Sequence, residues 1–329
     1  GSIRLPAAFC GVAGLKPTYG RVSKRGVLPL SWTLDTCGPL TWTVEDAAIM
    51  LQIIAGHDSR DPCTAKREVP DYKSALQDDL KGMRIGVVRH FYLQDSPADD
   101  TTVAAMEDAV QTLEDLGATL VEVTLPPLAD YQAVTRIIIV SEAFAIHRES
   151  LLSKPGLYSA VTRYRIMPGA LVSAAEYSNA LRFQRVLANK TVNAMGSLDA
   201  LLTATTYGPA PVQSQMRAEA NFAKPPLTGA FNAAQLPALS VCNGFAPEGL
   251  PLAMQIVGKP FDEATILRIG HAYERATKWR DIRPALKHPE SYVDPITTDV
   301  SLDTVDPTAL EQYRIRIESQ GMQLDEPQL

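Results

Sequence analysis

The residue types that carry most enzyme chemistry are spread along this chain of 329 residues and form no short cluster. The five histidines stand at positions 57, 90, 147, 271 and 288, so no metal site has local support in the sequence. Cys10 and Cys242 could act as nucleophiles, but neither has a histidine beside it to accept the thiol proton. We therefore expect all four cysteines, which include Cys37 and Cys63, to be reduced, small, buried apolar residues.

Several catalytic signatures are absent from the sequence. It contains no Gly-x-Ser-x-Gly turn, which disfavours an α/β-hydrolase, and no His-Glu-x-x-His motif. Gly82 and Gly86 do not belong to a Gly-x-Gly-x-x-Gly motif, and there is no phosphate-binding loop of the Walker type. The sequence therefore predicts neither a metal nor a nucleotide or other cofactor.

The most specific pattern lies at the amino terminus. Gly1-Ser2-Ile3-Arg4 opens a run that continues to Gly11, and the block Gly14-Leu15-Lys16-Pro17-Thr18-Tyr19-Gly20-Arg21 follows it. Together they closely resemble the amidase signature family, serine hydrolases that cleave carboxamides. The resemblance extends to about residue 284 through further blocks in the family's order: Leu34–Leu40, Thr43–Ala48, Ala55–Asp58, Lys81–Val87, Phe231-Asn232, Leu236–Val241, Gly249–Pro251, Gln255–Gly258 and Pro260–Glu263.

The resemblance implies a role for three residues of the first run. Ser2 matches the family's acylating nucleophile, which the family activates through a second serine on a cis peptide bond and a lysine. That lysine must be neutral to accept a proton, so burial has to lower its pKa from ~10.4. Gly1 belongs to the glycine-rich turn whose N–H groups form the oxyanion hole. Arg4 matches an arginine that braces the site through hydrogen bonds.

The sequence departs from the family pattern in front of Ser2. In family members the lysine and the cis-serine precede the nucleophile, whereas this sequence begins at Gly1. We therefore interpret the chain as the carboxy-terminal part of an amidase and expect it to be inactive alone. The nearest lysines are Lys16, which belongs to a structural block of the family, and Lys24; neither is expected to replace the missing base. A second departure is Trp42, which stands where the family usually has arginine.

Two other functions remain open beside a stand-alone amidase acting on a small-molecule carboxamide. One is the A subunit of a tRNA-dependent amidotransferase, which hydrolyses glutamine and passes ammonia to a partner. The Asn-Leu-x-Arg-Tyr-Asp-Gly-type block of that branch is missing around residues 142–148, and Pro225 stands where it has an acidic residue. The other is a non-catalytic amidase-like fragment.

Substrate choice is expected to depend on the segment between Tyr131 and Thr228, which matches no family block. Four large side chains in it either line an acyl pocket or pack in the core: Tyr158, Tyr164, Met167 and Tyr207.

The local patterns predict an α/β fold. Residues 82–125 read as a β-α-β unit, which places its two strands parallel. A Thr43–Asp46 capping box begins a helix that is apolar almost all round and is therefore expected to be buried. A second box at Ser173–Glu176 begins another helix, and Asp262 caps a last helix over residues 263–279.

Further strands are expected at residues 200–204, 238–241 and 252–257. With the resemblance, these elements imply a mixed, twisted sheet sandwiched between helices, incomplete because the amino-terminal portion is absent. Uncovered strand edges and apolar surface should then lower its solubility and thermal stability.

The charge distribution divides the chain into residues 1–284, the amidase part, and an acidic, proline-containing tail, residues 285–329. Nine Asp and Glu but only three Lys and Arg follow Pro284, which accounts for the whole net charge of -6. The neutral body has no basic surface for nucleic acid. The sequence shows no signal peptide and no membrane span, so a cytoplasmic protein is expected. The tail could wrap a neighbouring subunit, which would make the protein a homodimer.

Overall fold

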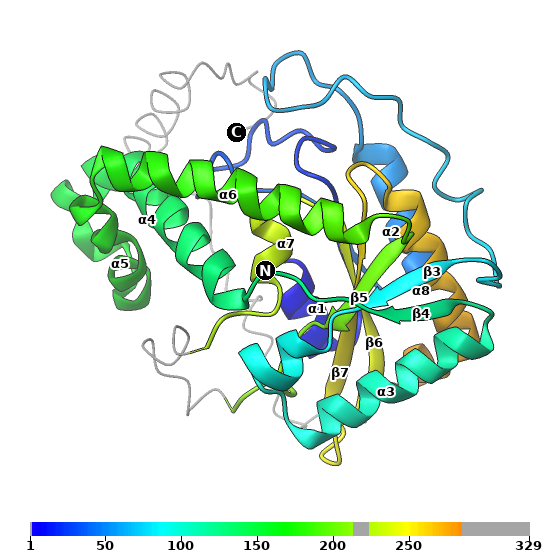
Figure 1. Ribbon diagram of the computed structural model, residues 1–329. Helices are drawn as coiled ribbons and strands as arrows, with labels where there is room; N and C mark the ends of the chain where they lie inside the picture. Colours follow the sequence, from blue (N-terminus) through cyan, green and yellow to red (C-terminus); the bar gives the residue numbers. More distant parts are fainter. Residues whose placement is uncertain (1, 213–223, 285–329) are drawn as a thin grey trace, which may run out of the picture.

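The computed structural model describes residues 2–212 and 224–284, and the strands in these residues form one mixed sheet (Figure 1). Its strand order is β2-β1-β6-β7-β5-β3-β4. Among the described strands, the parallel pairs are β3 with β4 and β3 with β5, and the other pairs are antiparallel. The parallel pairing of β3 with β4 confirms the β-α-β unit predicted for residues 82–125. The strands are β1 (Ala13–Lys16), β2 (Leu40–Thr41), β3 (Arg84–Val87), β4 (Thr119–Glu122), β5 (Ala200–Ala204), β6 (Ala238–Phe245) and β7 (Pro251–Gly258).

Helices cover both faces of the sheet, which confirms the expected α/β sandwich. On one face α8 packs on β6 and β7 and also contacts α2 and α3, while on the other face α1 lies directly on β1, β6 and β7. Helices α4, α6 and α7 lie on the same side as α1 (Figure 1). The helices are α1 (Arg4–Cys10), α2 (Val44–Ile54), α3 (Asp100–Asp115), α4 (Leu128–Ser153), α5 (Ala160–Ile166), α6 (Ala174–Met195), α7 (Gly229–Ala233) and α8 (Glu263–Ala276).

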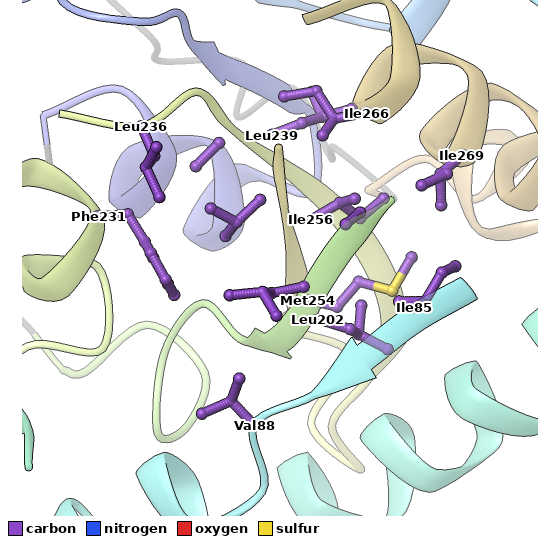
Figure 2. Packing of buried hydrophobic residues seen from close by; sticks show 14 of the residues in the cluster. Ile85, Val88, Leu202, Phe231, Leu236, Leu239, Met254, Ile256, Ile266 and Ile269 are labelled. Carbon is purple, nitrogen blue, oxygen red and sulfur yellow. The ribbon is translucent and has the colours of Figure 1, made fainter. Parts of the chain in front are cut away.

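The core occupies both sides of the central strands because these strands are buried on both faces. All five residues of β5 are buried, as are seven of the eight in β6 and in β7. Figure 2 shows Phe231 and Leu236 on the α7 side of the sheet and Ile266 and Ile269 on the α8 side. Near-continuous apolar runs are typical of strands covered by helices on both faces.

Local signals place most helix starts correctly. The Thr43–Asp46 and Ser173–Glu176 capping boxes are both formed, and Asp262 caps α8 as predicted. Helix α8 ends at Ala276, three residues earlier than predicted, and Trp279 begins a short 3-10 turn. No helix of the described residues has the length and apolar character needed to cross a membrane.

Two burial predictions were wrong. Helix α2 is buried along one stripe only, and Ile53 on its opposite side is 79% exposed, because only that stripe faces β1 and α8. Of the cysteines only Cys242 is buried, whereas Cys10 is exposed at the end of α1. Cys37 and Cys63 are partly exposed. The predicted tail, residues 285–329, lies outside the described residues.

Trp42 has a clear packing partner. The guanidinium of Arg283 lies over the Trp42 ring, 3.4 Å from its centroid. A cation stacked on an indole is a favourable contact. An arginine at position 42 would instead place two positive charges against each other.

Candidate active site

A row of residues crosses four neighbouring strands on the face that α1 covers. Antiparallel register sets Gly14 of β1 opposite Ser240, Ser240 opposite Gln255, and Gln255 opposite Thr203. Residues opposite each other in an antiparallel sheet point to the same face. Ser240, Gln255 and Thr203 are completely buried, so this row places polar groups in the middle of the molecule.

Helix α1 lies directly on the glycine that begins this row. A Cβ atom at Gly14 would lie 2.4 Å from the Cβ of Ala7 and 3.0 Å from the carbonyl oxygen of Ile3. Only glycine therefore allows α1 to approach β1 so closely. At the other end, Gly11 closes the helix in a left-handed conformation, φ +67°, and its N–H caps the carbonyls of Ala7 and Ala8.

Arg4, the first residue of α1, fixes the start of the helix to the centre of the sheet. Its side chain is completely buried, and Nη1 donates to Oε1 of Gln255. Nη2 donates to the carbonyl of Thr228 at 2.9 Å and to Oδ1 of Asn232 at 2.6 Å. These three hydrogen bonds join the start of α1 to β7, to α7 and to the segment before α7.

The orientation of the Gln255 amide is set by its other partners. Its Nε2 donates to the carbonyl oxygens of Ala204 at 2.9 Å and Leu227 at 3.1 Å, so Oε1 must face the guanidinium of Arg4. One glutamine thus connects β7, the end of β5, the segment before α7 and the start of α1. Neither Gln255 nor Asn232 was singled out in the sequence as a site residue, because their contact with Arg4 spans more than 220 positions.

Burial lowers the pKa of Arg4 to about 9, because desolvation disfavours the charged form. The guanidinium is nevertheless protonated at pH 7. Lys16 lies further along β1 than Gly14 and is also buried; its Nζ donates to the carbonyl of Pro17 at 3.0 Å. Burial, and then the charge of Arg4, hold the pKa of Lys16 well below its usual value.

Ser2 stands in the turn before α1 and is exposed, whereas Gly1 lies outside the described residues. No hydrogen bond in residues 2–212 and 224–284 joins Ser2 to Lys16 or Lys24. The Lys24 amine instead donates to the carbonyl of Trp32 at 2.7 Å and to the hydroxyl of Tyr19.

A buried carboxylate holds the loop that runs beside this region. Glu142 of α4 accepts hydrogen bonds from the hydroxyls of Ser31, Thr33 and Tyr177, and from the backbone N–H of Thr33. The carbonyl of Thr33 accepts in turn from the side chain of Gln235, just after α7. Glu142 therefore ties the loop to α4 and α6 through hydrogen bonds that the sequence did not predict.

Three of the four large side chains proposed to line an acyl pocket are surface residues. Tyr164, Met167 and Tyr207 are each at least 40% exposed, so the core-packing alternative is wrong for them. Tyr158 instead packs beside His147 with ring centroids 5.7 Å apart, next to a small apolar cluster at α4 and α5.

The histidines and acidic residues of the described chain form no metal site. Among these residues, no group of three or more His, Cys, Asp or Glu side chains could hold a metal ion. On α8, Nε2 of His271 lies 3.4 Å from a carboxylate oxygen of Asp78, and burial lowers the pKa of the imidazole. His57 contacts the hydroxyl of Thr64 at 3.0 Å.

Comparison with known proteins shows where the chain belongs. A family model described as Amidase matches residues 1–267. The chain belongs to the amidase signature family. It is 37% identical over 312 residues to the A subunit of glutamyl-tRNA(Gln) amidotransferase from Chloroflexus aurantiacus, and 37% identical over 300 residues to an amidase of Pseudomonas putida. Both alignments cover 87% of this chain and 63% of the relative.

Solved structures of family members have the same fold. The A subunit of glutamyl-tRNA(Gln) amidotransferase from Thermotoga maritima matches with a TM-score of 0.71 at 33% identity, over 84% of this chain and 60% of that one. The peptide amidase of Stenotrophomonas maltophilia matches with a TM-score of 0.69 at 28% identity, over 84% and 60%. The chain thus spans somewhat less than two thirds of the length of these family members.

Proposed function

We propose that Ser2 is the nucleophile of an amide hydrolase. Its Oγ attacks the carbonyl carbon of a small-molecule carboxamide, a base takes the hydroxyl proton, and the C–N bond breaks as the nitrogen leaves protonated. Water then hydrolyses the ester on Ser2 and releases the carboxylic acid. The observation that carries this proposal is an exposed serine two residues before Arg4, whose buried side chain fixes that turn to the sheet.

We further propose that residues 1–329 do not contain the groups that activate Ser2. Lys16 and Lys24 both donate to backbone carbonyls and have no hydrogen bond to Ser2 among the described residues. The base would then come from polypeptide in front of Gly1 in the full-length protein, as in the family pattern. Removing members of a catalytic unit can lower kcat by ~10⁴–10⁶, so the chain alone should show no turnover.

The experiment compares this chain with the full-length protein on a panel of small carboxamides, measuring ammonia or amine release. A serine-directed fluorophosphonate reports on the nucleophile independently of substrate choice. Ser2→Ala should abolish both signals in the full-length protein, whereas Ser178→Ala, at an exposed position on α6, should leave both unchanged. Full activity of Ser2→Ala would refute the proposal. If neither this chain nor the full-length protein turned over a carboxamide or reacted with the fluorophosphonate, a non-catalytic role would be favoured.

A second candidate is the A subunit of an amidotransferase. Sequence identity does not separate the two functions, because the chain is 37% identical to relatives of both names. The amidotransferase function predicts a stable complex with the other subunits of such an enzyme and glutamine as substrate. Affinity purification of the full-length protein that brings down no second protein would count against it.

A further inference from the structure

The guanidinium of Arg4 is buried among neutral acceptors. Its three hydrogen bonds go to two amide oxygens and one backbone carbonyl. No described carboxylate forms an ion pair with it, and the buried Glu263 is already engaged by Arg21 at 3.3 Å and by the N–H of Thr18. A desolvated cation without a counter-ion lowers the stability of the fold.

A carboxylate could stand at one of these acceptor positions without losing a hydrogen bond. Gln255 must be an amide, because its Nε2 donates to two buried carbonyls that a glutamate would leave unpaired. Asn232 is different: only its Oδ1 is used, by Arg4, and the residue is partly exposed. An aspartate there would keep the bond to Arg4 and pair its charge. Hydrogen bonding alone therefore does not explain why position 232 carries a neutral asparagine instead of an aspartate.

We propose that Asn232 is a positioning residue that holds Arg4 in place while leaving its positive charge unpaired. This inference rests on the proposed role of Ser2. Negative charge develops on the substrate oxygen when Ser2 attacks, close to the start of α1 that Arg4 anchors. A fixed, unpaired positive charge in a buried environment stabilises that developing charge more than it stabilises the neutral amide. Asn232 and Gln255 together keep the charge oriented.

The test replaces Asn232 by aspartate in the full-length protein and measures kcat, KM and thermal unfolding. Asn232→Asp should raise the unfolding temperature and lower kcat about 10- to 100-fold with little change in KM, because the charge acts on the transition state. Asn232→Ala removes the bond and should lower kcat without raising the unfolding temperature. The matched control is Asn179→Asp on α6, an exposed asparagine that also accepts from an arginine, Arg182, and should change neither quantity.

A purely structural brace gives a different result. The new aspartate side chain would keep the hydrogen bond to Arg4, so unchanged kcat in Asn232→Asp, together with inactive Ser2→Ala, would overturn this inference alone. A lower unfolding temperature in Asn232→Asp would also overturn it, because the charge of Arg4 would then not be unpaired. Equal turnover of the wild-type protein and Ser2→Ala would refute the proposed function, and this inference with it.

Discussion

Replacing Gly14 by alanine tests how closely α1 must lie on strand β1. The new Cβ would come within 2.4 Å of the Cβ of Ala7 and 3.0 Å of the backbone oxygen of Ile3, so helix and strand must separate by more than ~1 Å, since carbon atoms pack at ~3.5–4 Å. Overpacking of this kind costs about 1–3 kcal/mol. The lower entropy of the unfolded alanine chain offsets about 0.4–1 kcal/mol of that cost. We expect the free energy of unfolding to fall by about 2 kcal/mol. This lies in the upper part of the range that these costs allow, because the backbone oxygen of Ile3 cannot move aside as a side chain can.

Equilibrium unfolding in urea measures the loss, and two further variants test its cause. Gly156→Ala is the matched control, because a Cβ there meets nothing within 4 Å and should change the free energy of unfolding by less than ~0.5 kcal/mol. Ala7→Gly removes the atom nearest the new Cβ. It should therefore rescue part of the loss, giving a coupling of at least ~1 kcal/mol between the two changes.

Strict additivity of Gly14→Ala and Ala7→Gly would refute the reasoning, since the two side chains would then not meet. On the role proposed for Ser2, the same substitution should also lower the reactivity of that serine, because Ile3 joins Ser2 to the displaced helix. A stable Gly14→Ala protein with wild-type Ser2 reactivity would show that α1 need not sit this close.

Three further predictions concern buried polar groups and one aromatic contact. Burial raises the pKa of Glu274 to about 7, so the folded state favours the protonated carboxyl more than the unfolded chain does. The contribution of this group to the free energy of unfolding is therefore complete below pH ~4.5 and is lost as the pH rises through 7. Glu274→Gln should remove that dependence and gain up to about 3 kcal/mol at pH 8, as urea unfolding at pH 5 and pH 8 would show. Glu142→Ala leaves four donors without their carboxylate and should lose at least ~3 kcal/mol; a loss no larger than that of Tyr177→Phe would contradict the network. Trp42→Ala removes the stack with Arg283 and should cost about 1 kcal/mol, and a double-mutant cycle with Arg283→Ala that shows no coupling would exclude the contact.

The sequence predicts the local structure well where the signal lies within a few residues. The Thr43–Asp46 capping box begins α2 because the side chain and the backbone N–H that it caps are three residues apart. The same holds for Ser173–Glu176 at α6. The burial of α2 could not be predicted in this way. The sequence shows that a residue such as Ile53 is apolar, but not whether another helix or strand packs against it.

The candidate site shows the same division. Ser2 and Arg4 stand out in the sequence because the motif that contains them is short and specific. Gln255 and Asn232 come from distant segments and reach Arg4 only through the register of β6 on β7 and the position of α7. A glutamine in an apolar strand is a weak hint by itself, although a completely buried amide must find polar partners.

By itself, the sequence determined the family, the α/β class and the position of the nucleophile candidate, because these depend on short motifs and on hydrophobic periodicity. The tertiary structure decided which side chains meet: that α1 lies on Gly14, that Cys10 is exposed, and that the charge of Arg4 ends among neutral acceptors. The physical reason is that these contacts depend on strand register and packing between elements far apart in the chain, which no local pattern encodes.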